Sequence, residues 1–231
     1  MIDTGADWHT HSTTSDGMDS LEAMALAGAA AGLHTVGLSD HVRSTTTWLP
    51  EYVTAVRALR IGGLRVGCGV EVKMLDTRGT LDLPARLPTL DYLLIADHQF
   101  PGADGPASPR AVRGLVDSGR LSRSDAVEQI VRATCSALRR SPVPAIVAHL
   151  FSLLPKCGLG EEDVGQDLID ELAAAAVATG SAVEVNEKWR CPSARVVAVL
   201  AAGGVRITAG SDAHKLADVG RWTYVHDVAR A

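Results

Sequence analysis

The chain has 231 residues, a length that suits one α/β barrel domain spanning 1–231 and that can bury a substantial core. Its net charge of -5 argues against an extended nucleic-acid partner, because binding along a phosphate backbone requires a basic stripe. The four cysteines form no C-x-x-C pair, and no signal peptide or membrane-spanning run is visible. We therefore expect reduced thiols, a cytoplasmic location and no membrane partner; the sequence carries no signal for an oligomeric state.

Apolar runs typical of strands alternate with segments of helical period. Helices are predicted over residues 20–31, 50–61, 124–140, 162–178 and 193–202, several of them bounded by serine or glycine. Strands are predicted over a first run before His9 and over residues 35–38, 66–70, 92–96, 145–148, 182–185 and 205–209. Residues 101–121, rich in glycine, proline and arginine, predict a long loop after the fourth strand, whereas residues 74–90 give no clear pattern.

Histidines and acids stand at the ends of these apolar runs. The residues in such positions are Asp7, His9, His11, Asp16, Asp40, His41, Glu71, Asp97, His98, His149, Asn186, Asp212 and His214. Parallel strands that are buried on both faces read as unbroken apolar runs, and α/β folds carry their chemistry at the carboxyl ends of such strands. The sequence therefore predicts one polar centre to which seven strands contribute.

Two short motifs have the geometry of chelating pairs. In His9-x-His11 an extended backbone directs both imidazoles to the same side, and Asp212-x-His214 repeats this arrangement near the other end of the chain. Either pair alone could be a solvated strand end. Together with Glu71, His98 and His149 they indicate a shared site, since each buried imidazole or carboxylate without a partner would cost several kcal/mol.

The motifs also follow one another in a specific order. They are D-x-H-x-H-S at 7–12, S-D-G at 15–17, S-D-H at 39–41, G-x-E at 69–71, single histidines at His98 and His149, and G-S-D-A-H at 210–214. This series resembles the polymerase and histidinol phosphatase (PHP) family of metal-dependent phosphoesterases over essentially the whole chain. Residues 183–190 and 215–220 resemble the histidinol phosphatase side of the family.

The resemblance implies a fold and a set of metal ligands. The fold is a distorted seven-stranded (β/α)7 barrel with two or three divalent ions, manganese, iron or zinc, at the carboxyl ends of the strands. One ion would be held by His9, His11, Glu71 and Asp212, a second by Glu71, His98 and His149, and a third by Asp16, His41 and His214. Glu71, Asp212 and His214 are the candidate catalytic residues. Asp16 could instead be a turn residue before Gly17.

Neighbouring polar residues are given supporting or structural roles. We expect Asp7 and Asp40 to orient ligating histidines without contacting metal. Glu184 and Asn186 could line the mouth of the site or satisfy backbone groups. Asp97 is left out of the site, because a continuing strand would direct it away from His98. His34 and His226 are expected to be surface or packing residues.

The expected function is hydrolysis of a small phosphate monoester by a metal-bound hydroxide, as in histidinol phosphatases. Divalent ions give an acidic protein a cationic pocket and can stabilise both oxygens of a phosphoryl transfer. Basic residues after strand ends could hold the phosphate, namely Arg43, Lys188, Arg190 and Lys215. One alternative is a phosphatase or exonuclease acting on nucleotides or oligonucleotides, which the few basic and aromatic residues disfavour. A second alternative is a non-catalytic PHP scaffold. Loss of metal-ligating residues from the sequence would indicate it, and the set is retained here.

Overall fold

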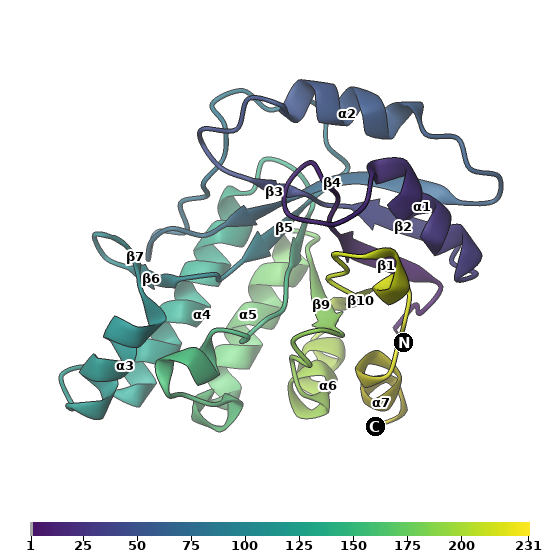
Figure 1. Cartoon of the computed structure of the whole chain (residues 1–231). Coiled ribbons are helices and arrows are strands. Elements are labelled where there is room, and N and C mark those ends of the chain that lie inside the picture. The colour runs from purple at the N-terminus through teal and green to yellow at the C-terminus, as the bar shows by residue number, and fades with distance from the viewer. Residues whose placement is uncertain (1) are drawn as a thin grey trace.

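Seven parallel strands form a nearly closed barrel (Figure 1). This computed structural model describes residues 2–231. The strands follow the order β1 (Ala6–Thr10), β2 (Thr35–Leu38), β4 (Arg65–Lys73), β5 (Tyr92–Ala96), β8 (Ala145–Val147), β9 (Ala182–Asn186) and β10 (Arg206–Gly210). A short strand, β3 (His41–Val42), also pairs with β4 in parallel. The predicted seven-stranded barrel is therefore confirmed.

The barrel closes at the carboxyl ends of its first and last strands. The His11 backbone N–H donates to the carbonyl of Ala213 over 2.8 Å, and the Ala213 N–H donates to the carbonyl of His9 over 3.3 Å. Ala213 lies just beyond β10 and forms a parallel bridge with Thr10. Because this closure joins the H-x-H and D-x-H motifs, it brings the two ends of the sequence into one site.

Helices cover the outside of the barrel. Figure 1 shows α4 (Arg123–Arg140), α5 (Gln166–Ala178) and α6 (Ala194–Ala202) side by side, with α1 (Leu21–Ala30) and α2 (Leu49–Ala58) beyond the opposite strands and α7 (Tyr224–Arg230) near both termini. The bounds of α1, α2, α4, α5 and α6 agree closely with the predicted helices, except that α5 begins after a short 3-10 turn at Glu161–Asp163. Helix α7 was not predicted. None of the helices in residues 2–231 combines the length and apolar character needed to cross a bilayer.

The prediction of a long loop over residues 101–121 is wrong. This region contains a hairpin, β6 (Phe100–Gly102) and β7 (Gly105–Ala107), followed by α3 (Pro109–Asp117). The Ser108 hydroxyl accepts a hydrogen bond from the backbone N–H of Ala111, and Pro109 occupies the first turn, both of which favour helix initiation. The helix buries only Val112 fully, so its apolar face is short. A composition rich in helix breakers concealed these local signals.

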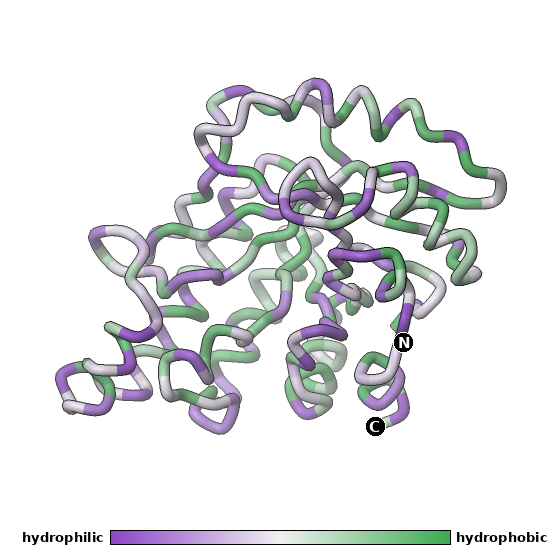
Figure 2. The backbone as a smooth tube through the Cα atoms, viewed as in Figure 1, coloured by the Kyte–Doolittle hydropathy of each residue, from purple (hydrophilic) through white to green (hydrophobic). Residues whose placement is uncertain are grey.

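The apolar interior divides into two parts. A large cluster draws residues from Ile2 to Val228 and lies mainly between the strands and the helices, while hydrophobic stretches follow the strands in Figure 2. A smaller cluster contains Tyr92, Leu94, Ala96, Ile146, Ala148 and Ala182. Leu94 is the register partner of Glu71, so both residues share the inner face of the sheet. The polar centre therefore lies beside an apolar floor. All four cysteines are buried and unpaired.

Candidate metal centre

The nine residues predicted as ligands meet at the carboxyl ends of the strands. His9 lies on β1, His41 on β3 and Glu71 on β4, while the remaining members follow strand ends. Each of the nine contacts at least one other member of the set, which is His9, His11, Asp16, His41, Glu71, His98, His149, Asp212 and His214. We call this set the polar centre.

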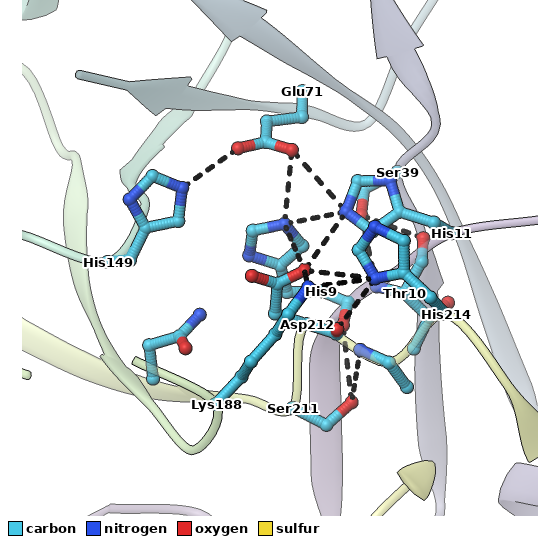
Figure 3. Close-up of polar contacts among 12 residues, drawn as sticks. His9, Thr10, His11, Ser39, Glu71, His149, Lys188, Ser211, Asp212 and His214 are labelled. Carbon is cyan, nitrogen blue, oxygen red and sulfur yellow. Dashed lines mark hydrogen bonds and ion pairs between the residues drawn. The ribbon is translucent and has the colours of Figure 1, made fainter. Parts of the chain in front are cut away.

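Glu71 occupies the middle of the polar centre and uses its two oxygens differently. Oε1 lies 3.0 Å from Nε2 of His98 and 3.0 Å from Nε2 of His149. Oε2 lies 3.3 Å from Nε2 of His9 and 3.0 Å from Nδ1 of His41. Figure 3 shows the carboxylate between His149 on one side and the His9 and His11 rings on the other. One side chain, 1% exposed, thus joins two groups of imidazoles.

Asp212 approaches the His9 and His11 pair from the opposite end of the chain. Its Oδ1 lies 3.5 Å from Nε2 of His11 and 4.0 Å from Nε2 of His9. The same oxygen is 3.3 Å from Nδ1 of His214. Asp212 has a φ of 54°, a left-handed conformation that aspartate tolerates better than most residues. At this position the carboxylate faces His9, His11 and His214.

Asp16 contributes from the loop that follows β1. Its carboxylate oxygens lie 3.4 Å from Nε2 of His41, 3.5 Å from Nε2 of His214 and 3.8 Å from Nδ1 of His11. The Asp16 side chain is 53% exposed, in contrast to the buried Glu71. Asp16 therefore lies in a turn and also faces three imidazoles at the solvent side of the polar centre.

Donor atoms in the polar centre converge in three groups that could each hold an ion. The groups are His11, Asp16, His41 and His214; His9, His11 and Glu71; and His41, Glu71 and His98. They overlap with the three sets implied by the family resemblance. The differences are that His11 joins the Asp16 group, that His41 takes the place of His149 beside Glu71 and His98, and that Asp212 is in none of the three groups.

The tautomers of the histidines fit metal binding. Nδ1 of His9 lies 2.8 Å from Oε1 of Glu184, so a proton on Nδ1 leaves the Nε2 lone pair facing the centre. In His214, Nδ1 lies 2.9 Å from the Asp212 carbonyl, which likewise frees Nε2. Nδ1 of His11 is buried and lacks a hydrogen-bond partner among residues 2–231. A divalent cation could bind the lone pair of such a nitrogen, so the residues present fit the implied metal ions.

The pKa values of several residues in the polar centre shift toward ion pairing, although burial lowers that of His11. Burial lowers the pKa of His9, but the charges of Glu184 and Glu71 raise it well above its ordinary value. Burial raises the pKa of Glu71, but the charge of His9 and a hydrogen bond from His149 hold it well below its usual range. For His149, burial is outweighed by Asp97 and Glu71, which raise its pKa to about 10. The buried carboxylates therefore require positive charge, from protons or from divalent cations.

Two carboxylates outside the set hold the donors in place. Glu184 is fully buried: Oε1 contacts Nδ1 of His9, and Oε2 accepts a 2.6 Å hydrogen bond from the His149 backbone N–H. It satisfies interior groups and does not line the mouth. Asp97, left out of the site by strand alternation, lies with Oδ1 3.6 Å from Nδ1 of His149. That exclusion is wrong because β5 ends at Ala96 and the alternation stops there.

Sequence reasoning had assigned Glu184 no definite role, although an acid flanked by valines within a strand is itself a signal of a buried polar contact. Ser152 was missed altogether. Its hydroxyl lies 3.0 Å from Nδ1 of His149 and 3.5 Å from Asp97, and no local motif distinguishes it from other loop serines. Asn186 is also buried, and its amide donates to Oε2 of Glu184.

Asp7 and Asp40 support the loops that carry the ligands. Asp7 accepts backbone hydrogen bonds from His9, Ser211 and Gly220. Asp40 accepts from the backbone and hydroxyl groups of two serines in the loop after β1, Ser12 and Ser15. Both carboxylates thus act on backbone and hydroxyl groups of the loops that carry the ligands.

Two cavities flank the polar centre and separate the predicted phosphate-binding residues. One, of about 340 Å³, includes Lys188 and, unforeseen from the sequence, Arg221. The other, of about 370 Å³, includes Arg43 and, also unforeseen, Lys73. Lys188 Nζ lies 3.2 Å from Oδ1 of Asp212. The two cavities therefore present basic side chains on both sides of the centre.

The other two predicted phosphate-binding residues do not line either cavity. The Arg190 guanidinium lies over the ring of Tyr224, with its carbon 5.4 Å from the ring centroid. Lys215 pairs with Asp218 over 3.7 Å and is 53% exposed. His34, which pairs with Asp3, and His226, exposed on α7, lie outside the polar centre as expected.

Comparisons with known proteins agree with the motif order and the fold. The PHP domain family matches residues 7–188. A protein from Caldicellulosiruptor bescii described as a "probable phosphatase" is 26% identical over 225 residues, which cover 92% of this chain and 81% of that protein.

Two solved structures show the same fold at low identity. Histidinol phosphate phosphatase from Lactococcus lactis subsp. lactis Il1403, complexed with zinc, L-histidinol and phosphate, has a TM-score of 0.69 and 15% identity, covering 97% of this chain and 90% of that one. A candidate histidinol phosphatase from Listeria monocytogenes has a TM-score of 0.65 and 15% identity, with 94% and 97% covered.

Proposed function

The chain belongs to the PHP domain family of phosphoesterases, and from this premise we propose that it hydrolyses a small phosphate monoester with the help of divalent metal ions. The observation that carries the proposal is the position of Glu71, whose two oxygens face two separate groups of imidazoles. Such a carboxylate suits two neighbouring cations, and paired cations suit phosphoryl transfer.

Two or three ions would be held by the residues of the polar centre. We assign His9, His11, Glu71 and Asp212 to one ion, Glu71, His98 and His149 to a second, and Asp16, His41 and His214 to a third, with manganese, iron or zinc as candidates. Bound there, the ions would lower the pKa of water and neutralise charge on phosphoryl oxygens.

Residues of this chain would hold the substrate in position next to the ions. Glu71, Asp212 and His214 together contact all three donor groups, so we assign the reacting centre to them. Lys188 and Arg43 stand on opposite sides of this centre and would bind the phosphate or a neighbouring group. Such chemistry needs neither a glycine-rich phosphate-binding loop nor a serine nucleophile in a G-x-S-x-G motif.

The size and charge of the surroundings favour a small substrate. Cavities of about 340 and 370 Å³ suit a metabolite-sized molecule. A nucleic acid would require a series of basic contacts along its backbone, and the net charge of -5 gives no support for such a surface.

The test compares a matched phosphate monoester and diester at low and moderate salt, with manganese, zinc and iron in parallel. We expect a higher kcat/KM for the monoester and a modest salt dependence. Arg43→Lys should lower kcat/KM for the monoester several-fold, because guanidinium can make two hydrogen bonds to phosphate where ammonium is a point charge. Arg190→Lys serves as the matched control, since Arg190 contacts Tyr224.

Two outcomes would reject this proposal, and a third would reject the role of Arg43. Faster diester or oligonucleotide cleavage with steep salt dependence would indicate the nuclease alternative. Failure of the metal-loaded protein to hydrolyse any ester in a panel of sugar, amino-alcohol and nucleotide phosphates would favour a non-catalytic scaffold. Equal losses in Arg43→Lys and Arg190→Lys would remove the special role of Arg43.

A further inference from the structure

Trp189 lies in the loop after β9, at the edge of the polar centre. Its indole N–H donates a 2.8 Å hydrogen bond to Oδ2 of Asp212. Its backbone N–H donates to Oδ1 of Asn186 over 2.9 Å, which fixes the loop at the end of the strand. Trp189 is nevertheless 40% exposed. A large aromatic ring that is only partly buried gains little hydrophobic stabilisation at this position. Packing alone gives a weak account of this residue.

The two oxygens of Asp212 have different surroundings. Oδ2 is occupied by the indole N–H, whereas Oδ1 faces His11 at 3.5 Å, His214 at 3.3 Å and Lys188 at 3.2 Å. A free carboxylate could turn about its terminal bond and exchange the two oxygens. The directional bond from a rigid two-ring side chain opposes that rotation.

The indole ring of Trp189 also has contacts that restrain its position. Lys156 Nζ lies 3.9 Å from the centroid of the Trp189 ring, a cation–π contact. The His149 ring centroid lies 6.0 Å away. Trp189 is therefore restrained by Asn186, Lys156 and Asp212 together, and it is well placed to transmit this restraint to the carboxylate.

We propose that Trp189 is a positioning residue for Asp212, holding Oδ2 so that Oδ1 alone is presented to the ion shared with His9 and His11. This inference rests on the proposed metal centre. It assigns a role to a side chain that the sequence analysis had not singled out within residues 183–190. The indole acts through Asp212 and has no contact of its own with the reacting atoms.

The decisive variant is Trp189→Phe, which keeps an aromatic ring and removes the N–H. We expect the affinity of one ion to fall about 10- to 100-fold, the usual effect of removing a group that orients a ligand. Trp222→Phe is the matched control, because the Trp222 indole N–H donates to the Thr4 carbonyl away from the centre. Metal titration followed by elemental analysis measures the affinities, and thermal unfolding of both chelated variants checks their folding.

A double-mutant cycle with Asp212→Ala separates positioning from general structure. If Trp189 acts through Asp212, adding Trp189→Phe to Asp212→Ala should cause no further loss of metal affinity. Wild-type affinity in Trp189→Phe, or an undiminished further loss in the double variant, would overturn the inference while leaving the metal centre intact. A wild-type protein that binds no metal would overturn the proposed function itself.

Discussion

Glu71 carries a buried charge that its neighbours must compensate. Its carboxylate is 1% exposed, and a buried carboxylate without partners would become protonated. His98 and His149 face one oxygen, and His9 and His41 face the other. The same arrangement that stabilises the charge makes the residue suitable for bridging two cations.

Replacing Glu71 with Gln should weaken two metal sites at once, because the change keeps the side-chain shape and removes the negative charge. His98→Ala should mainly affect one site, since His98 faces only Oε1 of Glu71. We expect a loss of more than one ion per chain in the first variant and of about one in the second. Elemental analysis of metal-loaded protein measures both. Full metal content and full hydrolysis rate in Glu71→Gln would show that Glu71 does not bridge, and His34→Ala provides the control outside the centre.

The segment between β4 and β5, which gave no clear sequence pattern, is organised by one carboxylate. Oδ1 of Asp76 accepts backbone hydrogen bonds from Arg78 and Thr80, each 3.0 Å long. Oδ2 accepts from the Arg78 guanidinium over 2.8 Å. Gly79 completes the turn with a φ of 71° and lies so close to the backbone of Ala137 that a side chain would collide with α4. This turn therefore fixes the segment against its neighbouring helix.

Asp76→Asn should destabilise the fold at neutral pH and lose its effect in acid. Burial alone would raise the pKa of Asp76, but hydrogen bonds from Arg78 and Thr80 lower it to about 2, below its ordinary value of 3.8. The stabilisation is thus complete above the unfolded-state pKa and is lost as pH falls toward 2. We expect a cost of about 1–3 kcal/mol at pH 7.

Urea unfolding at about pH 7 and pH 3 measures this difference between wild type and Asp76→Asn. The cost should shrink at the lower pH. Asp104→Asn, a change at an exposed position between β6 and β7, is the control and should have little effect at either pH. An equal cost at both pH values would mean that the charge of Asp76 is not what stabilises the turn.

At the scale of elements, helices were predicted well where a capping serine or a glycine stop bounds a segment of good helix formers. Ser20 is the N-cap of α1, as expected, and its hydroxyl accepts from the backbone N–H of Ala23. The helix α3 has the same kind of cap at Ser108 but only one fully buried residue, Val112. This helix is short and polar on average, so the surrounding glycines, prolines and arginines concealed it.

The whole molecule is joined at the polar centre, because the contributing residues extend from His9 to His214 and the barrel closes between β1 and Ala213. Removing metal should therefore lower thermal stability and abolish hydrolysis together, and restoring metal should recover both. A ligand present at 100 times its Kd stabilises a fold by about 2.7 kcal/mol.

Differential scanning calorimetry of chelated and metal-loaded protein measures this coupling. Asp212→Ala should gain less from added metal than the wild type, because it lacks one proposed ligand. A Tm that does not change on chelation, in protein shown by elemental analysis to have lost its ions, would separate metal binding from closure of the barrel.

The sequence by itself determined the alternation of strands and helices, the seven parallel strands and the residues that stand at their carboxyl ends. These features depend on local periodicity and on the order of short motifs, both of which can be read along the chain. Only the tertiary structure decided that Glu184 and Asp97 contact His9 and His149, that Arg190 turns to Tyr224, and that Trp189 reaches Asp212. Those contacts join side chains from separate loops and strands, so their existence depends on how the barrel closes and where each strand ends, which no local pattern specifies.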